Sequence, residues 1–254
     1  MSKSFNLNGK NILITGSTKG IGRGIAEITA EAGANVIITS RHQEDCDEVA
    51  NIINKKYGVK TLGISFDVTD INSIELLVQN VIKNFSKIDV LFNNAGTAIT
   101  KKVDEITEKD WDKIININLK GAFFVSQKVA KIMMKQKEGK IINISSIFGT
   151  VGEKQILPYL ASKGGLNQIT RGLSLELAKY NINVNSIAPG YIKTPMNKKD
   201  LEMPKIHDHI MSNTPLKRFA KIEDLYGVIL LLASDYGDYI TGEIIKVDGG
   251  WTAH

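Results

Sequence analysis

A tyrosine and a lysine one helical turn apart could form an acid–base pair in the stretch PYLASK, residues 158–163. If this stretch is helical, Tyr159 and Lys163 lie at positions i and i+4 on one face. A free tyrosine has a pKa of about 10, but a nearby ammonium group favours the phenolate and lowers that pKa. On an exposed helix the same two residues would provide only surface polarity, so the rest of the chain must decide between these interpretations.

A glycine-rich turn between a strand and a helix offers a second chemical feature, a seat for phosphate. The stretch ILITGSTKGIGRGIA places its glycines in the spacing T-G-x3-G-x-G. Glycine lets a ligand approach the backbone closely, and the N-terminus of the following helix presents free N–H groups and the positive end of its dipole to pyrophosphate. We therefore predict a dinucleotide site here. The predicted contacts in the turn are Gly16, Ser17, Lys19, Gly20, Ile21 and Gly22.

The end of the second predicted strand, ITSRHQ, bears on which dinucleotide binds. NAD-binding proteins usually place an acidic residue there, about 20 residues after the turn, to hold the ribose 2′-hydroxyl. Ser40 stands at that position, Arg41 follows it, and Lys19 lies within the glycine turn. Both cations would suit a 2′-phosphate, although solvated surface cations are common. We expect NADP(H) as the preferred cofactor, with NAD(H) as the alternative.

Short apolar runs that alternate with stretches of helical periodicity must position these residues. The runs are apolar almost throughout, as expected of strands covered on both faces. The predicted strands are Asn11–Thr15, Asn35–Thr39, Lys60–Phe66, Ile88–Asn94, Lys140–Ser145, Ile182–Ala188 and Glu243–Val247. The predicted helices include Ile21–Ala32, Ile71–Asn84, Trp111–Lys135 and Tyr159–Tyr180. The alternation favours an α/β fold of the doubly wound Rossmann type, with a single seven-stranded parallel sheet and helices on both faces.

No linker or repeat divides the chain, so we expect residues 1–254 to form a single dinucleotide-binding and catalytic domain. The segment from about 191 to 218 has no strand signal, and it holds three of the five prolines. We expect it to pass over the carboxyl edge of the sheet, where ligands bind in such folds. His207 and His209 in this segment lack a third ligand at convincing spacing. We therefore expect no metal site and place both histidines on a solvated lid helix.

The composition narrows the classes of function. The net charge is +5, but no basic block with interleaved aromatic residues occurs, which disfavours nucleic acid as a partner. No run of about 18 uncharged apolar residues suggests a membrane span, and the start MSKSFNLNGK lacks the apolar region of a signal peptide. The single cysteine, Cys46, cannot form an internal disulfide. We expect a cytoplasmic protein that does not bind membranes.

Seven motifs occur in one order and together resemble the single-domain short-chain dehydrogenase/reductase family over about residues 8–250. They are TGSTKGIG (15–22), FDV (66–68), NNAG (93–96), NINLKG (116–121), NISS (143–146), YLASK (159–163) and APGYIKT (188–194). The resemblance implies that Tyr159 is the general acid or base and that Lys163 binds the nicotinamide ribose and lowers the tyrosine's pKa. It further implies that Ser146, rather than Ser145, hydrogen-bonds the substrate oxygen. Asn118 would hold a water that links Lys163 to solvent.

The same resemblance implies cofactor contacts outside the glycine turn. Asp67 and Val68 would meet the adenine, residues 94–96 would line the adenosine ribose, and residues 189–194 would cover the nicotinamide and its phosphate. The full set is Ser40, Arg41, Asp67, Val68, Asn94, Ala95, Gly96, Tyr159, Lys163, Pro189, Gly190, Ile192 and Thr194. The expected enzyme is an oxidoreductase acting on CH–OH donors. Its cofactor carries the hydride, while Tyr159 manages one proton and Ser146 stabilises the developing oxyanion.

The substrate is a small molecule with a carbonyl or alcohol group, and several classes remain open. Residues 157–196 are similar to gluconate 5-dehydrogenases, which interconvert gluconate and 5-ketogluconate, and Lys193 with the pair 198–199 would attract a carboxylate. The C-terminal part resembles 3-oxoacyl-acyl-carrier-protein reductases, the alternative. Lys137 and the pair 179–180 stand where such enzymes typically carry carrier-binding arginines. Steroid, bile-acid or general carbonyl reduction also fits.

Two other classes of dinucleotide-binding protein fit this sequence less well. A redox-inactive dinucleotide-binding sensor is disfavoured because such relatives usually lose Tyr159 or Lys163, both of which this chain keeps. A sugar-nucleotide epimerase of the extended branch is disfavoured by the turn spacing and the chain length. The family is mostly tetrameric, so the resemblance implies a homotetramer.

Overall fold

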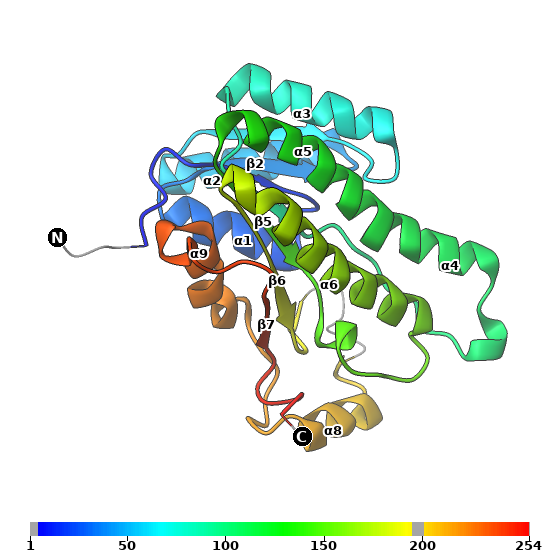
Figure 1. The fold of residues 1–254 in the computed structure, drawn as a ribbon. Helices are drawn as coiled ribbons and strands as arrows, with labels where there is room; N and C mark the ends of the chain where they lie inside the picture. The colour runs from blue at the N-terminus through cyan, green and yellow to red at the C-terminus, as the bar shows by residue number, and fades with distance from the viewer. Residues whose placement is uncertain (1–4, 195–200, 254) are drawn as a thin grey trace.

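One parallel sheet forms the centre of the molecule in the computed structural model, which describes residues 5–194 and 201–253 (Figure 1). The strands are β1 (Asn11–Ile14), β2 (Asn35–Ser40), β3 (Thr61–Ser65), β4 (Val90–Asn93), β5 (Gly139–Ile144), β6 (Ile182–Pro189) and β7 (Ile244–Val247). They are ordered β3-β2-β1-β4-β5-β6-β7. The chain leaves β1 toward β2 and returns to β1's other side at β4, which is the switch point where ligands bind in such sheets.

Helices cover both faces of this sheet, which confirms the predicted doubly wound Rossmann fold. They are α1 (Gly20–Glu31), α2 (Gln43–Tyr57), α3 (Ile71–Phe85), α4 (Glu108–Ile115), α5 (Ala122–Gln136), α6 (Leu157–Leu177), α8 (Pro204–Asn213) and α9 (Tyr226–Ala233). In Figure 1, α1, α2 and α9 lie on one side of the sheet, and α3, α5 and α6 lie on the other. Within the described residues, no helix combines the length and apolar character needed to span a bilayer.

The two faces of the sheet enter two separate apolar cores. In β1, Ile12 and Ile14 pack into the core under α1, α2 and α9, whereas Leu13 packs into the core under α3 and α5. The alternation follows from the two-residue period of a strand, and all three side chains are 0% exposed. Burial of each such side chain contributes roughly 1.5–3 kcal/mol relative to exposure. A continuous apolar run in the sequence therefore stabilises the packing on both faces of the sheet.

The predicted helix Trp111–Lys135 is the clearest difference between sequence and structure. The segment begins as α4, passes through a π-helical turn, η2 (Asn116–Gly121), and continues as α5. A Cβ on Gly121 would lie 2.6 Å from the backbone oxygen of Val68, so glycine permits a close approach between this turn and the loop after β3. Such π-helical turns are rare in proteins, and many of those that occur lie at functional sites. This one contains Asn118.

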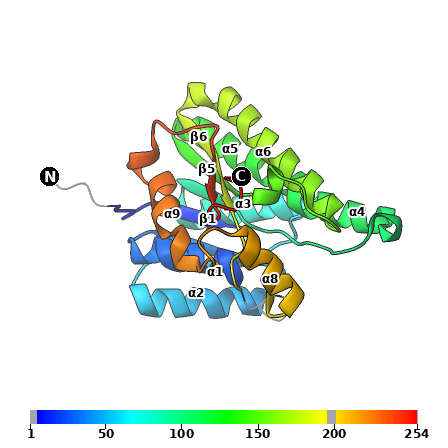
Figure 2. The same cartoon turned by 90° about the horizontal axis from the view of Figure 1, so that it is seen from below.

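The described part of the segment after β6 lies at the carboxyl edge of the sheet. Ile192 forms an isolated parallel bridge with Ala220, and the intervening chain carries α8. Figure 1 shows α8 near the C-terminus, beyond the end of β7, and Figure 2 shows α8 from below. The expected carboxylate-attracting pair at 198–199 lies outside the described residues.

Candidate active site

The predicted site residues gather at one edge because the strands that precede them are parallel. The glycine turn follows β1, the segment 94–96 follows β4, Ser146 follows β5, and Gly190 follows β6. Carboxyl ends of parallel strands meet at the same edge of a sheet. Four short segments that are remote in sequence therefore surround one space.

The glycine turn has the conformation that its residues predict. Gly16 and Gly20 adopt φ values of +65° and +58°, in the left-handed region that glycine tolerates. A Cβ on Gly22 would overlap the carbonyl oxygen of Gly16 and the amide of Asn94. Lys19, the N-cap of α1, has extended backbone and makes no side-chain hydrogen bond to the helix. The first amides of α1 thus lack a side-chain cap, which leaves an anion seat.

Two residues predicted to touch the cofactor use their side chains to build the turn. The Ser17 hydroxyl donates to the Ile14 carbonyl at 2.9 Å and accepts from the Thr39 amide at 2.9 Å. The Asn94 side-chain amide donates to the carbonyl oxygens of Thr15 and Gly16 at 2.9 and 2.8 Å. These bonds hold the turn between β2 and β4. The Ser17 hydroxyl proton is therefore used within the protein, and the Ser17 amide also donates to the Thr39 carbonyl, at 2.8 Å.

The predicted adenosine side is polar and open to solvent. Arg41 is exposed, and the Ser40 hydroxyl accepts from the His42 amide at 3.2 Å. The Asp67 carboxylate accepts from the amide and hydroxyl of Thr69. Those hydrogen bonds hold the pKa of Asp67 below its ordinary value, and the charge of Arg41 adds to the effect. Arg41 and Asp67 thus lie within electrostatic reach of each other at this end of the site.

Tyr159 and Lys163 both lie on α6, one turn apart, as the sequence predicts. Lys163 is only 5% exposed, and its Nζ lies 5.5 Å from the centre of the Tyr159 ring. The Nζ atom donates to the Ile144 carbonyl at 2.7 Å, at the end of β5. Ser146 follows that strand and caps a short 3-10 turn, where its hydroxyl accepts from the Phe148 amide at 3.2 Å. The exposed-helix interpretation of the tyrosine–lysine pair is therefore wrong for this lysine.

The pKa of the phenol differs from the expected direction. Burial raises the pKa of Tyr159 above its ordinary value, and a hydrogen bond involving Ser146 opposes this shift. Burial also lowers the pKa of Lys163 to about 8. Removing water penalises the charged form of each group. At neutral pH the pair consists of a neutral phenol beside a charged lysine.

Asn118 joins the loop after β4 to α6. Its side-chain oxygen accepts from the Thr97 amide at 2.8 Å, and its side-chain nitrogen donates to the Thr97 carbonyl at 2.8 Å and to the Ser162 hydroxyl at 3.1 Å. Asn118 is 1% exposed. A Cβ on Gly96 would lie 3.4 Å from the Asn118 Oδ1 and 3.8 Å from the Lys163 Nζ. The side chain thus joins the loop after β4 to α6 beside Lys163. Both of its N–H groups donate to protein atoms, and its oxygen accepts one hydrogen bond.

The segment after β6 reaches the glycine turn. A Cβ on Gly20 would lie 3.9 Å from the Thr194 Cγ2 atom, and Gly190 packs so that its Cβ would lie 2.9 Å from the Cα of Asp248. Ile192 is buried at its bridge to Ala220. Pro189 ends β6 itself. The predicted nicotinamide contacts therefore border the same space as the predicted phosphate contacts.

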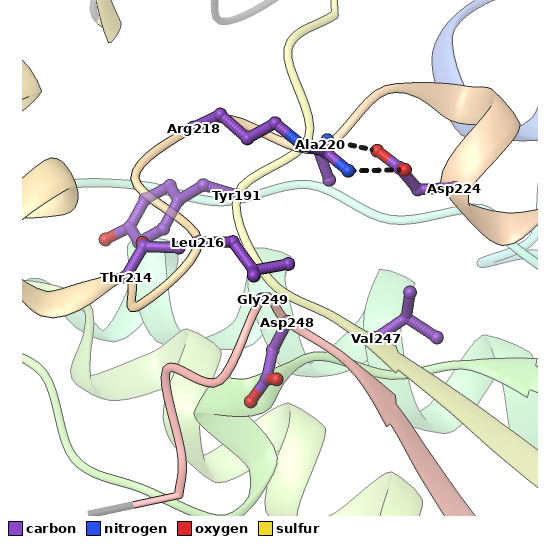
Figure 3. A pocket seen from close by; sticks show the side chains of 9 residues that line it. All are labelled: Tyr191, Thr214, Leu216, Arg218, Ala220, Asp224, Val247, Asp248 and Gly249. Carbon is purple, nitrogen blue, oxygen red and sulfur yellow. Dashed lines mark hydrogen bonds and ion pairs between the residues drawn. The ribbon is translucent and has the colours of Figure 1, made fainter.

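A pocket of about 140 Å³ lies against this segment (Figure 3). Its lining residues are Tyr191, Thr214, Leu216, Arg218, Ala220, Asp224, Val247, Asp248 and Gly249. Arg218 donates to both carboxylate oxygens of Asp224, at 2.6 and 2.8 Å. The pocket does not include Ser146, Tyr159 or Lys163, so it is separate from the predicted catalytic centre, although Tyr191 connects the two regions.

Residues that sequence reasoning missed lie next to Tyr191. Its ring lies 5.8 Å from Phe148 and 5.2 Å from Trp251, between ring centres. His209 of α8, expected as a solvated lid residue, lies 5.8 Å from the Trp251 ring and 3.3 Å from the Glu153 carboxylate. No spacing rule could find this cluster, because its members come from four distant segments. Within the described residues, no group of three metal-binding side chains occurs.

Known proteins match this chain over nearly its whole length. Residues 16–252 match the family model described as enoyl-(acyl carrier protein) reductase. A 3-oxoacyl-[acyl-carrier-protein] reductase of Thermotoga maritima is 41% identical over 244 residues, which cover 96% of this chain and 98% of the relative. A 5-keto-D-gluconate 5-reductase of Escherichia coli is 38% identical over 250 residues, with 98% of both chains covered. The crystal structure of a gluconate 5-dehydrogenase from Burkholderia cenocepacia with NADP and tartrate matches with a TM-score of 0.95, 34% identity and 98% coverage of both chains.

Proposed function

Because this chain belongs to the short-chain dehydrogenase/reductase family, we propose that it transfers a hydride between NADP(H) and the carbonyl or secondary alcohol of a sugar acid, such as 5-ketogluconate and gluconate. The observation that carries the proposal is the convergence of Ser146, Tyr159 and Lys163 beside the uncapped α1 and its glycine turn. The nearby relatives named for 5-ketogluconate and gluconate support the substrate class.

The residues present suit an NADP(H) cofactor. The uncapped N-terminus of α1 and the left-handed glycines suit the pyrophosphate. Arg41 and Lys19 are exposed cations near the end of β2 and in the turn, and Ser40 takes the place of the acidic residue typical of NAD binding. Arg41 would hold the 2′-phosphate, while Lys163 would bind the nicotinamide ribose. NADP in the structure of the Burkholderia relative supports this preference, and NAD(H) is the second choice.

Each catalytic group has one proposed task. The bound cofactor supplies or accepts the hydride. In reduction, the protonated Tyr159 phenol donates its proton to the substrate oxygen, and the Ser146 hydroxyl hydrogen-bonds that oxygen as charge develops on it. The Lys163 ammonium lies close enough to stabilise the phenolate that remains. Asn118 holds the loop after β4 in place and contributes a water path from Lys163 to solvent.

A second candidate function is reduction of a 3-oxoacyl group on acyl-carrier protein. The 41% identity to the Thermotoga reductase favours it. An acidic carrier protein would need a basic docking surface. Lys137 and Lys179 are exposed at the ends of α5 and α6. The Lys179 Nζ lies over the Tyr180 ring, 5.2 Å from its centre, which is a cation–π distance. Lysines supply charge there without the bidentate geometry of arginine.

A cofactor-oxidation assay tests the reaction class and separates the two substrates. We expect the purified protein to oxidise NADPH with 5-ketogluconate, and to do so faster than with an acetoacetyl thioester. Tyr159→Phe removes the transferable proton and should lower kcat by at least about 100-fold while NADPH binding persists. Turnover of the thioester alone would favour the second candidate. Binding of NADPH without turnover of any ketone would move the protein to a sensor role.

The preference for NADP(H) has its own variant. Arg41→Asp replaces the proposed phosphate-binding cation with the acidic residue that suits a ribose 2′-hydroxyl. The Kd for NADPH should rise by at least about tenfold, because the new charge repels the 2′-phosphate. The Kd for NADH should fall, because the aspartate can accept from the ribose 2′-hydroxyl. Lys137→Asp, which makes the same charge change at the far end of α5, is the control. Equal Kd changes in both variants would show that Arg41 does not meet the phosphate.

We also propose a homotetramer, one folded domain over residues 1–254 and a cytoplasmic location. Leu175 of α6 is 82% exposed, and such an apolar side chain suits a subunit contact. All seven strands belong to one sheet, which supports one cooperative unit. Sedimentation should give four times the 27.9 kDa chain mass, and a 27.9 kDa particle would refute the assembly. Two separate unfolding transitions in calorimetry would refute the single domain.

A further inference from the structure

Three aromatic rings from separate segments form a wall beside the catalytic residues. Phe148 follows the catalytic serine and donates its amide to the Ser146 hydroxyl at 3.2 Å. The Tyr191 ring, in the segment after β6, packs edge-on against Phe148, and Trp251 near the C-terminus packs against both, with ring centres 5.2 Å from Tyr191 and 6.5 Å from Phe148. We call these three residues the aromatic wall.

A carboxylate lies at the edge of the aromatic wall. The Glu153 side chain is only 20% exposed, in the loop between β5 and α6. Its Oε2 atom lies 3.3 Å from His209 Nε2, and its Oε1 atom accepts from the Lys154 amide at 2.7 Å. His209 in turn lies edge-on to the Trp251 ring, 5.8 Å between centres. The histidine therefore fixes the carboxylate against the wall.

The carboxylate and the catalytic phenol both act on Tyr191. Burial, with smaller contributions from the charges of Glu153 and Tyr159, raises the pKa of Tyr191 to about 12. Glu153 and Tyr159 thus both lie within electrostatic reach of Tyr191. A carboxylate has about four lone-pair positions, and among the described residues one donor reaches each of its two oxygens. Acceptor capacity remains for a ligand.

We propose that Glu153 determines substrate specificity by accepting hydrogen bonds from the hydroxyl groups of a polyhydroxylated substrate, whose C–H surface packs on the aromatic wall. The inference rests on the proposed hydride transfer and names the kind of molecule that undergoes it. Hydrogen bonds from hydroxyls to an ionised carboxylate are stronger than those between neutral groups, and aromatic rings offer the apolar surface that a sugar's C–H groups need.

The same arrangement disfavours a plain acyl chain. A saturated chain on the aromatic wall would remove water from the Glu153 carboxylate without replacing its hydrogen bonds, which is unfavourable. The carboxylate also repels the acid group of a sugar acid. A sugar acid should therefore bind with its hydroxylated end toward Glu153 and α8, and its carboxylate pointing away from them.

Two substitutions at this position test the proposal by substrate ratio. Glu153→Leu removes both the charge and the acceptors, whereas Glu153→Gln keeps one acceptor. With NADPH, Glu153→Leu should lower kcat/KM for 5-ketogluconate by about 10- to 100-fold, mainly through KM. The kcat/KM for an acetoacetyl thioester should rise, because the carboxylate that an acyl chain would desolvate is removed. Glu153→Gln should fall between wild type and Glu153→Leu. Lys154→Gln, which changes the exposed neighbour, is the control.

Fluorescence provides a readout that does not require turnover. The chain has two tryptophans, so Trp111→Phe leaves Trp251 as the sole tryptophan reporter. In that background, gluconate should change the Trp251 emission, and Glu153→Leu should abolish the saturable change. If Glu153→Leu lowers kcat/KM equally for the ketone and the thioester, the proposed role of Glu153 is wrong. The same follows if both the ratio of the two kcat/KM values and gluconate binding stay unchanged. Either result would leave the proposed function standing. A wild-type protein that binds NADPH but reduces neither compound would overturn the proposed function, and this inference with it.

Discussion

Replacing the buried lysine of the site should stabilise the protein while inactivating it. Lys163 is 5% exposed, and its pKa falls from 10.5 to about 8 because burial penalises the ammonium. A shift of this size corresponds to roughly 3 kcal/mol of lost stability whenever the lysine is charged in both states. Lys163→Met removes the charge and keeps most of the side-chain volume. Such a trade of stability for activity is common at functional sites.

The pH dependence identifies the cause. Below pH 8, folded and unfolded chains both hold the proton, so the full penalty is present. As the pH rises from 8 toward 10.5, the folded chain releases its proton while the unfolded chain keeps it, and the free energy of unfolding increases. Loss of the hydrogen bond to the Ile144 carbonyl costs Lys163→Met about 1 kcal/mol. The variant should therefore gain roughly 2 kcal/mol at neutral pH, and by pH 9 roughly 1 kcal/mol of that gain should be gone.

Urea unfolding of wild type and Lys163→Met, at neutral pH and at pH 9, provides the measurement. Lys140→Met is the matched control. Lys140 is 7% exposed, but its Nζ lies 2.6 Å from the Asp238 carboxylate, so its removal also removes an ion pair and should bring no gain. A Lys163→Met protein that is less stable than wild type, with the same difference at both pH values, would refute the argument that burial controls this lysine.

Three further substitutions probe the frame of the site. Gly22→Ala places a Cβ against the Gly16 carbonyl, so NADPH binding, followed by cofactor fluorescence, should weaken at least about tenfold while the fold persists; an unchanged Kd would show that the turn can shift. Asn118→Ala removes the side-chain amide that bonds the backbone N–H and carbonyl of Thr97, so the free energy of unfolding, measured in urea, should fall by about 2–4 kcal/mol. A loss below about 1 kcal/mol would mean that water replaces the amide. Arg218→Ala breaks an exposed ion pair and should leave the free energy of unfolding nearly unchanged. A clear loss of stability would assign the pair a structural role.

Local patterns in the sequence were sufficient for the frame of the protein. A strand covered on both faces needs an apolar run, and Ile12, Leu13 and Ile14 show why, since they enter two different cores. The glycine turn depends on backbone conformations that glycine adopts within a few residues. Tyr159 and Lys163 meet because they are four residues apart on one helix. Each of these features depends on neighbours in the chain, which the sequence displays directly.

Tertiary packing decided the features that depend on residues far apart in sequence. The π-turn that carries Asn118 lies where Gly121 meets the backbone of Val68, a contact with no local signature. The pKa of Tyr159 lies above its ordinary value because surrounding segments bury the phenol, and no local pattern in the sequence displays that burial.

The sequence by itself determined the fold through its periodicity, and the reaction class through short motifs that resemble a known family. The spacing of Tyr159 and Lys163 likewise determined that they share one face of a helix. Only the tertiary structure brought Glu153, His209 and Trp251 together, from the loop before α6, from α8 and from the C-terminus. The physical reason is range. Backbone geometry and helical spacing act over a few residues, whereas burial, charge and ring packing act through space between any segments that the fold brings into contact.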